Sequence, residues 1–271
     1  MRTALTIAGS DPSGGAGIQA DLKTFAAFGV YGASAITAIT VQSTRGVDGV
    51  APLSADLVTA QIEAIAGDFA IAATKIGMLA TAAIVEAVAA AIEELDLPLV
   101  VVDPVLVSSS GSRLLDDDGV AALRAGLIPL ARVVTPNVPE AEALSGVRIA
   151  TPADARTAAR RIQDMGAAAV IITGGHEPAA ARASAASTVV DLLLDGDTFL
   201  ELAVPRVVSA HTHGTGCTFA SAVAARLALG DALEAAAARA QRYVAGAIAH
   251  APGLGHGRGP LDHFWESRSG V

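Results

Sequence analysis

The lone cysteine among 271 residues, Cys217, lies in the stretch Gly214-Thr215-Gly216-Cys217-Thr218, where a glycine turn runs into an apolar helical pattern. Glycines let successive backbone N–H groups converge, because they tolerate positive φ angles. The first turn of a helix also leaves N–H groups without intrahelical partners and carries a partial positive charge. Together these features predict an anion site. A thiol placed there should ionise more readily than a free one and could act as a base. A small buried residue behind a tight turn is the alternative interpretation.

A second glycine-rich segment, residues 9–17 (GSDPSGGAG), follows the first predicted strand. It lacks the Lys-Ser/Thr pair that a P-loop carries after its second glycine. Its last part imitates a dinucleotide fingerprint, but it comes several residues beyond the strand, and the next strand ends in Gln42, where that fingerprint has an acidic residue. We interpret the segment as a loop that begins at Gly9 and brings its backbone and Asp21 close to a small ligand. Glycines that serve loop geometry alone are the alternative.

Polar residues or a glycine turn directly follow four predicted strands, at Gly9, Asp103, Asn137 and Thr173. In a parallel sheet, ligands bind beyond the carboxyl ends of the strands, so we expect these positions on one rim. The Asp103 carboxylate suits Mg²⁺ or the neighbourhood of phosphates. The amide of Gln42, at the end of another strand, offers a donor and an acceptor, as the edge of an aminopyrimidine requires. A capping side chain is the alternative for Gln42.

Asn137 and Glu140 lie three residues apart where a helix is expected to begin. That spacing puts both side chains on one face of the helix. The same pair could be an N-cap residue and the partner that completes a capping box, which is compatible with a functional role. His211 and His213 could share a face of an extended segment, but the sequence offers no third ligand at a convincing spacing, so we predict no zinc site.

Strand and helix patterns alternate along the chain. The expected strands are 4–8, 34–40, 73–76, 99–102, 132–135, 169–173, 189–194 and 199–204. The expected helices are 15–28, 55–66, 82–95, 119–125, 139–144, 153–165, 218–229 and 233–250. This alternation predicts an α/β fold with a mostly parallel sheet covered by helices. The last two strands, which flank an Asp-Gly-Asp turn, predict one antiparallel hairpin, and residues 176–187 are expected to form a surface loop.

The composition indicates one domain that spans residues 1–271. A net charge of −9 and the lack of a basic run argue against nucleic acid as a partner. Mean hydropathy is +0.51, but the longest uncharged run, residues 24–44, contains glycines and ends in β-branched residues, so we expect no membrane span. A single cysteine excludes an internal disulfide. Since the start of the chain shows no signal peptide, the expected location is the cytoplasm.

Five motifs stand in order along nearly the whole chain, at residues 8–24 (AGSDPSGGAGIQADLKT), 74–79 (TKIGML), 135–141 (TPNVPEA), 211–218 (HTHGTGCT) and 255–260 (GHGRGP). With these motifs the chain resembles the hydroxymethylpyrimidine/phosphomethylpyrimidine kinases of thiamine biosynthesis, in the ribokinase-like superfamily. The resemblance implies a three-layer sandwich whose central, mostly parallel sheet is flanked by helices. It also implies ATP-dependent phosphorylation, with Mg²⁺, of 4-amino-5-hydroxymethyl-2-methylpyrimidine and of its monophosphate, and a homodimer.

The resemblance further implies roles for individual residues. Cys217 is the expected catalytic base, and Gly214 and Gly216 are expected to form the anion hole with it. The residues expected to bind the pyrimidine are Gly9, Asp21, Gln42, Met78 and Val105. Those expected to bind the nucleotide are Asn137, Thr173 and Thr215, and those expected to bind the metal are Asp103 and Glu140. Thr173 stands where many members of the family carry lysine, so we expect no nucleotide contact that depends on that lysine.

The predicted mechanism is proton removal from the substrate's hydroxymethyl group by the Cys217 thiolate. The alkoxide then attacks the γ-phosphorus, while the amides of residues 214–217 and Mg²⁺ stabilise the negative charge. Two other functions stay open: a pyridoxal or pyridoxine kinase of the same fold, and a non-catalytic pyrimidine-binding protein. Gln42 together with Met78 favours the aminopyrimidine, and the retained cysteine and carboxylates favour an enzyme.

Overall fold

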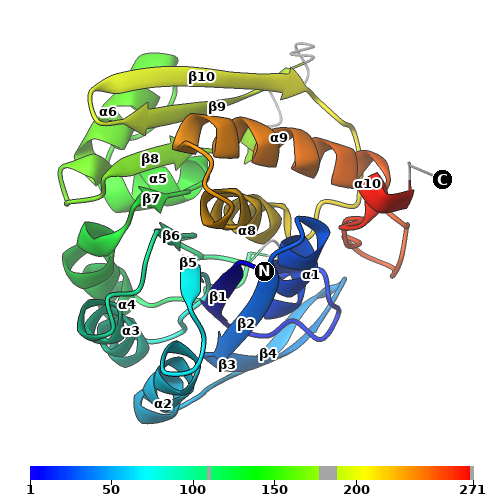
Figure 1. The fold of residues 1–271 in the computed structure, drawn as a ribbon. Helices are drawn as coiled ribbons and strands as arrows, with labels where there is room; N and C mark the ends of the chain where they lie inside the picture. Colours follow the sequence, from blue (N-terminus) through cyan, green and yellow to red (C-terminus); the bar gives the residue numbers. More distant parts are fainter. Residues whose placement is uncertain (109–110, 177–187, 269–271) are drawn as a thin grey trace.

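The computed structural model describes residues 1–108, 111–176 and 188–268. Its centre is an eight-stranded sheet with the strand order β10-β9-β8-β7-β6-β5-β1-β2 (Figure 1). The strands are β1 (Thr3–Ala8), β2 (Tyr31–Ile36), β5 (Ile71–Ile76), β6 (Val100–Val102), β7 (Val133–Val134), β8 (Ala169–Ile172), β9 (Thr188–Asp195) and β10 (Thr198–Pro205). From β8 to β2 all neighbours are parallel, whereas β9 and β10 pair antiparallel. The predicted mostly parallel sheet and its antiparallel hairpin formed by the last two strands are both confirmed.

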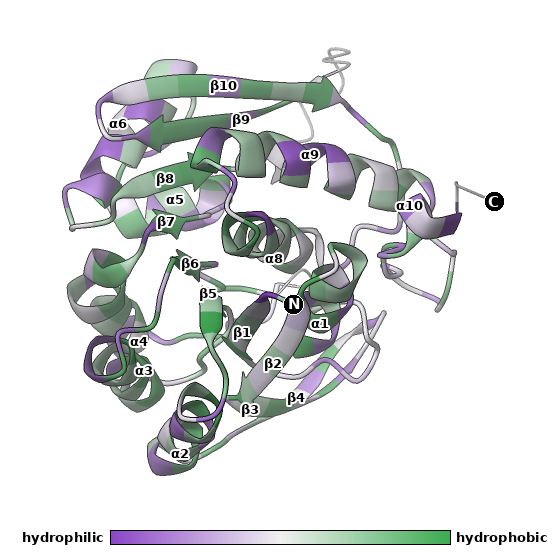
Figure 2. Cartoon of the chain, in the orientation of Figure 1, coloured by the Kyte–Doolittle hydropathy of each residue, from purple (hydrophilic) through white to green (hydrophobic). Residues whose placement is uncertain are grey.

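Side chains of the central strands alternate between two hydrophobic clusters, one on each face of the sheet. Along β6, Val100 and Val102 belong to one cluster and Val101 to the other, as the period of two in a strand dictates. The helices that cover the first face are α2 (Ala55–Ala66), α3 (Ala82–Glu94), α4 (Asp117–Ala122), α5 (Val138–Ser145) and α6 (Pro152–Gln163). Those on the second are α1 (Gly17–Ala27), α8 (Thr215–Ala228) and α9 (Leu233–Ala249). Figure 2 shows hydrophobic strands between helices whose outer faces are more hydrophilic, which confirms the three-layer sandwich.

A separate two-stranded sheet, β3 (Ala38–Ser43) and β4 (Gly46–Pro52), lies at the β2 edge of the large sheet (Figure 1). The sequence predicts one strand over 34–40, but the structure divides it at Thr37. The Thr37 N–H donates to the carbonyl of Ala8 (3.1 Å), and its hydroxyl donates to the carbonyl of Met78 (2.6 Å). Strand β4 is absent from the predicted set because its sequence, GVDGVAP, combines residue types that disfavour strands. The hairpin carries Gln42 out to the rim.

Most helices match their predicted ranges to within a few residues. Many begin at a side-chain cap, and the capping residues are Ser54, Thr81, Asp116, Asn137 and Thr151. The expected helix at 119–125 is longer, because α4 continues through a π turn (Leu123–Leu127). The short helix α10 (Trp265–Arg268) is not predicted, and the expected loop beyond His176 lies outside the described residues. Among those residues no helix has the length and apolarity needed to cross a membrane.

Candidate active site

The two glycine-rich segments of the sequence meet in the structure. Gly214 precedes helix α8 with a φ of 82°, and a Cβ atom added to it would lie 1.8 Å from the carbonyl oxygen of Gly15. Glycine is therefore required at position 214 both by its positive φ and by this backbone contact. The predicted anion turn packs on the loop that follows β1, and the first N–H groups of α8 point away from the helix body.

Cys217 lies in the first turn of α8, between the first loop and the end of β6. The Gly17 N–H lowers the pKa of its thiol, and the thiol in turn lowers the pKa of the Asp103 carboxyl, so both groups lie close to the sulfur. Burial raises the pKa of the Cys217 thiol, and the charges of Asp103 and Asp21 raise it further, against the opposing attraction of Lys75. The residue keeps some accessible surface, yet the helix start does not ionise it. The prediction of an easily ionised thiol is wrong for the ligand-free protein.

A buried lysine lies beneath this cysteine. The Nζ of Lys75, on β5, is 3.0 Å from Oδ2 of Asp21, and neither side chain has any exposed surface. Burial alone would lower the pKa of Lys75, but the negative charges of Asp21 and Asp103 outweigh it and raise that pKa. Lys75 is therefore a permanent cation below the reactive groups. The sequence analysis does not single it out, although a lysine inside an apolar strand is a detectable signal, since such a residue is rarely buried without a partner.

The position of Asp21 corrects its predicted role as a pocket-lining residue. Its Oδ2 accepts hydrogen bonds from the Thr6 hydroxyl (2.6 Å) and from Lys75, and its Oδ1 accepts one from the Ser221 hydroxyl (2.6 Å). Asp21 is fully buried. It supports Lys75 from within the core, so it does not face a ligand.

Two carboxylates approach each other at the carboxyl edge of the sheet. Asp103 follows β6, and Glu140 lies in the first turn of α5. Burial, aided by the charge of Asp21, raises the pKa of Asp103 to about 6 although Lys75 opposes the shift. Burial and the charge of Asp103 raise the pKa of Glu140 to about 8. Asp103 Oδ2 is buried and has no hydrogen-bond partner in the described part of the chain. The carboxylates of Asp103 and Glu140 could therefore bind a cation together.

The Asn137–Glu140 pair forms the capping box that the sequence analysis offers as an alternative. The Asn137 side chain accepts from the Glu140 N–H (3.0 Å), and a Glu140 oxygen accepts from the Asn137 N–H (2.9 Å). Asn137 also pairs with Thr173 in an isolated parallel bridge, and the Thr173 N–H donates to the carbonyl of Pro136 (2.9 Å). The structure thus places two of the predicted nucleotide-binding residues side by side, while Thr215 lies at the start of α8.

Residues predicted to bind the pyrimidine gather around the first loop. The Gly9 N–H donates to the carbonyl of Met78 (3.1 Å), and a Cβ on Gly9 would lie 3.2 Å from the Met78 sulfur. Gln42, on β3, lies 3.3 Å from the ring of His213, measured between the two Nε2 atoms. Val105 follows Asp103 and donates its N–H to the Asp103 carbonyl (2.8 Å). Gly9 and Met78 are therefore in contact, Gln42 lies beside the residue that precedes the anion turn, and Val105 lies next to the rim carboxylate Asp103.

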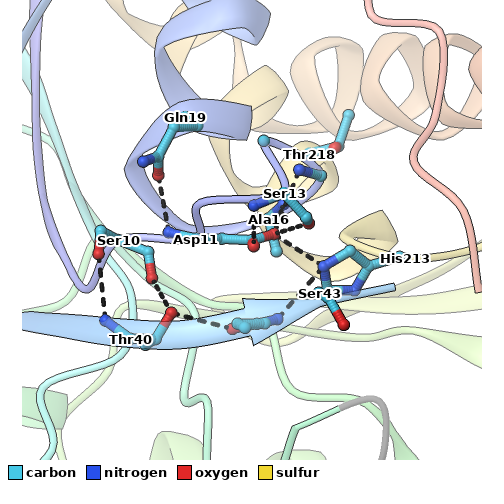
Figure 3. A network of polar contacts seen from close by, with 12 residues as sticks. Ser10, Asp11, Ser13, Ala16, Gln19, Thr40, Ser43, His213 and Thr218 are labelled. Atoms are coloured by element: carbon cyan, nitrogen blue, oxygen red, sulfur yellow. Dashed lines mark hydrogen bonds and ion pairs between the residues drawn. The ribbon is translucent and has the colours of Figure 1, made fainter. Parts of the chain in front are cut away.

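His213 is paired with a carboxylate instead of forming part of a metal cluster. Its Nε2 lies 2.8 Å from Oδ2 of Asp11, and both side chains are buried (Figure 3). Within the described residues no group of three or more His, Cys, Asp or Glu side chains could hold a metal ion. The sequence analysis does not predict the Asp11–His213 contact, because the two residues lie 202 positions apart.

Known proteins resemble the chain along nearly its whole length. The family model described as phosphomethylpyrimidine kinase matches residues 11–262. The chain is 46% identical over 268 residues to the hydroxymethylpyrimidine/phosphomethylpyrimidine kinase of Bacillus subtilis (strain 168), which covers 99% of this chain and 97% of that protein. A Bacillus subtilis pyridoxal kinase, solved as an ADP complex, superposes with a TM-score of 0.88 at 39% identity over 99% of each chain. A phosphomethylpyrimidine kinase from Clostridium difficile 630 has a TM-score of 0.78 at 38% identity, over 90% of this chain and 98% of that one.

Proposed function

Because this chain belongs to the phosphomethylpyrimidine kinase family, we propose that it transfers the γ-phosphoryl group of ATP to 4-amino-5-hydroxymethyl-2-methylpyrimidine and then to the monophosphate. It is a phosphotransferase of thiamine biosynthesis. The observation that carries this conclusion is the family match over residues 11–262, since it includes the anion turn, the lone cysteine and both rim carboxylates. We further propose that residues 1–271 act as one kinase domain.

The pyrimidine is held between the hairpin and the first loop. Gln42 reads the ring edge through its amide, and Met78 packs against the ring, with Gly9 leaving room for a close approach and Val105 nearby. The hydroxymethyl group then points toward Cys217 and the first turn of α8. Asn137, Thr173 and Thr215 contact the nucleotide, and the amides of residues 214–217 stabilise negative charge on the transferred phosphoryl group.

Cys217 removes the proton of the substrate hydroxyl as a thiolate, and this requires a change from the ligand-free state. Burial and the charge of Asp103 keep the thiol neutral, whereas Lys75 favours its ionised form. If a cation offsets the charge of Asp103 when the reactants bind, Asp103 no longer raises the pKa of Cys217 as strongly. The positive charge of Lys75 then favours the thiolate with less opposition. Ionisation of Cys217 thus accompanies formation of the full complex, and Lys75 is the positioning residue that makes it possible.

Mg²⁺ fits the two rim carboxylates. Asp103 and Glu140 supply oxygen ligands, Asp103 Oδ2 has no protein partner among the described residues, and Mg²⁺ commonly takes one or two carboxylates together with substrate phosphates. When bound, the ion would offset the charge of both carboxylates and neutralise phosphate oxygens of ATP. The lack of a third acidic or histidine ligand in the described structure is consistent with a site that the nucleotide completes.

Glu140→Gln is expected to raise the stability of the ligand-free protein at pH 8.5. The pKa of Glu140 is raised to about 8, so its ionisation destabilises the fold progressively as pH rises from the unfolded value toward 8, and most of the cost is absent at pH 5. Glutamine keeps an oxygen for the Asn137 N–H. We expect a gain of at least about 1 kcal/mol, or roughly 2–4 °C in the midpoint of thermal unfolding, at pH 8.5 and a clearly smaller gain at pH 5.

Thermal unfolding followed by calorimetry, with Mg²⁺ and ADP added, tests the assignment of Glu140 as a metal ligand. The ion should raise the unfolding midpoint of the wild type more than that of Glu140→Gln. Glu86→Gln, an exposed position on α3, is the matched control and should behave as the wild type. An equal Mg²⁺-dependent shift in both proteins would remove Glu140 from the metal site.

The substrate assignment is tested by an ATP-coupled assay with the hydroxymethylpyrimidine, its monophosphate and pyridoxal side by side. Pyridoxal kinase activity is the second candidate, because a protein with that name shares the fold at a TM-score of 0.88. We expect the two pyrimidines to be the better substrates. Phosphorylation of pyridoxal alone would overturn the assignment, and binding without turnover of any of the three would favour a non-catalytic pyrimidine-binding protein.

A homodimer in the cytoplasm is the proposed assembly and location. The β3–β4 hairpin exposes Ile39 (46%), Val41 (63%) and Val50 (39%), an apolar surface that a second copy of the chain would cover. A free cysteine suits a reducing compartment, and the net charge of −9 gives no support to a nucleic-acid partner. Light scattering on the wild type and on Val41→Glu tests the dimer, since the charged variant should dissociate.

A further inference from the structure

Asp11 and His213 lie 202 positions apart in sequence and form a buried contact that the proposed chemistry does not use. Asp11 belongs to the loop after β1, and His213 immediately precedes the anion turn. Gln42, on the hairpin, lies 3.3 Å from the same imidazole nitrogen, measured from its amide nitrogen. Three elements of the candidate site therefore meet at one atom, Nε2 of His213.

We propose that Asp11 and His213 are positioning residues that fix which way round the Gln42 amide is presented to the substrate ring. This inference rests on the proposed function, in which Gln42 reads the edge of an aminopyrimidine. In this proposal the Asp11–His213 pair helps to determine which ring is bound, although only Gln42 contacts the substrate.

Asp11 can only accept hydrogen bonds. Its two oxygens take the N–H groups of Ser13 (2.9 Å), Gly15 (3.2 Å) and Ala16 (2.8 Å), the Ser13 hydroxyl (2.9 Å) and the His213 ring. Burial alone would raise the pKa of Asp11, but the hydrogen bonds from His213 and Ser13 outweigh it and lower that pKa to about 2. A carboxylate with this many donors is ionised, so Nε2 of His213 must carry the proton in their contact.

The orientation of the Gln42 amide follows from that proton. An amide nitrogen 3.3 Å from Nε2 of His213 would set two donors against each other, whereas the amide oxygen can share the Nε2 proton. On its other side the amide meets the Thr40 hydroxyl at 3.3 Å, and that hydroxyl donates to the Ser10 carbonyl at 2.8 Å. Thr40 is thus free to accept from the amide nitrogen. Oxygen and nitrogen of a glutamine are assigned from such a network, and here both neighbours select the carbonyl toward His213.

This orientation decides what the ring meets. With its oxygen on the His213 side, the amide presents its remaining lone pair there and its remaining N–H on the Thr40 side. An aminopyrimidine edge, with an amino donor beside a ring acceptor, matches that order in one orientation only. Because His213 directly precedes Gly214, the pair also ties the orientation of Gln42 to the position of the anion turn. A ring bound in the other sense would point its hydroxymethyl group away from Cys217.

Asp11→Asn and His213→Gln test the pair in the full-length protein, with calorimetric binding of hydroxymethylpyrimidine and of ADP as separate readouts. Asp11→Asn allows the amide to turn, so we expect pyrimidine affinity to fall about 10- to 100-fold, as for loss of a buried hydrogen bond to a charged group, and ADP affinity to change little. His213→Gln retains an N–H donor and should lose less affinity than His213→Leu. Asp154→Asn, in the exposed capping box of α6, is the control for loss of a carboxylate.

A double-mutant cycle separates positioning from mere structural support. In a Gln42→Ala background, Asp11→Asn should have almost no further effect on pyrimidine affinity, since the amide that it orients is gone. An undiminished effect in that background, or an equal loss of ADP affinity, would overturn the proposal.

Nitrogen-15 NMR of the ligand-free wild type gives a readout that does not depend on substrate. We expect a hydrogen-bonded proton on Nε2 of His213 and its loss or shift in Asp11→Asn. Absence of that proton in the wild type would overturn the inference even if the pyrimidine binds. Conversely, a wild type that shows the proton but binds no pyrimidine would overturn the proposed function and leave the Asp11–His213–Gln42 hydrogen-bond order established.

Discussion

Cys217→Ala is expected to lower kcat by about 10²- to 10⁴-fold, the usual effect of removing a general base. The polar groups that interact with the Cys217 thiol include the Gly17 N–H and the Asp103 carboxylate, neither of which is proposed to bind the ring. Pyrimidine affinity should therefore stay within about threefold of the wild type, because the lost interaction belongs to the transition state. Steady-state kinetics together with calorimetric binding of the pyrimidine measures both quantities.

Two further variants sharpen this test. Cys217→Ser keeps a hydroxyl that can donate to Asp103 but is a far weaker base when ionisation is required, so it should resemble the alanine variant in kcat. Ser267→Ala, at an exposed position on α10, should leave both kinetic constants unchanged. Turnover of Cys217→Ala close to that of the wild type would remove the thiol from the chemistry and leave phosphoryl transfer to positioning and charge stabilisation.

The ionisation state of the thiol can be measured directly, because the sequence contains one cysteine. The rate of alkylation by iodoacetamide follows the thiolate fraction. Since burial raises the pKa of Cys217, the ligand-free protein should react more slowly at pH 7.5 than a free cysteine does. An inflection below that of free cysteine would restore the sequence-based prediction of an activated thiol.

Features encoded by local patterns could be predicted from the sequence. The run of valines in β6 predicts a strand that is covered on both faces. The glycine turn at Gly214 predicts the start of a helix with converging N–H groups. The capping box at Asn137 and Glu140 is visible as a three-residue spacing. In each case the information lies within a few neighbouring residues, so hydrogen-bond geometry and side-chain period suffice.

Contacts between distant segments could not be predicted in the same way. Asp21 and Lys75 lie 54 positions apart, and nothing in either local pattern states that one neutralises the other. The sequence analysis assigns Asp21 to the ligand from the neighbouring glycine-rich loop and the family resemblance, whereas the structure buries it. The error over Cys217 has the same origin: the helix start is a local feature, but the burial that decides the pKa comes from β6, α1 and the first loop.

Lys75→Met is expected to produce the largest loss of stability, about 3–5 kcal/mol, because it leaves the buried Asp21 carboxylate without its cation. The space around Lys75 is tight, since a Cβ on Gly77 would lie 2.7 Å from Nζ, and methionine is the apolar residue of nearest shape. Urea unfolding monitored by circular dichroism measures the change. Arg113→Met, which breaks the exposed Arg113–Asp117 pair, should cost less than about 1 kcal/mol.

The double variant Asp21→Asn with Lys75→Met distinguishes a structural cation from a catalytic one. Removing both charges should recover much of the lost stability, because no ionised group is left unpaired at that pair. Activity should stay low, since Cys217 and Asp103 would still lack the positive charge that favours their ionised forms. Activity restored in step with stability would reduce Lys75 to a partner of Asp21. Restored stability without restored activity would show that Lys75 favours the ionisation of Cys217, although Lys75 does not contact the substrate.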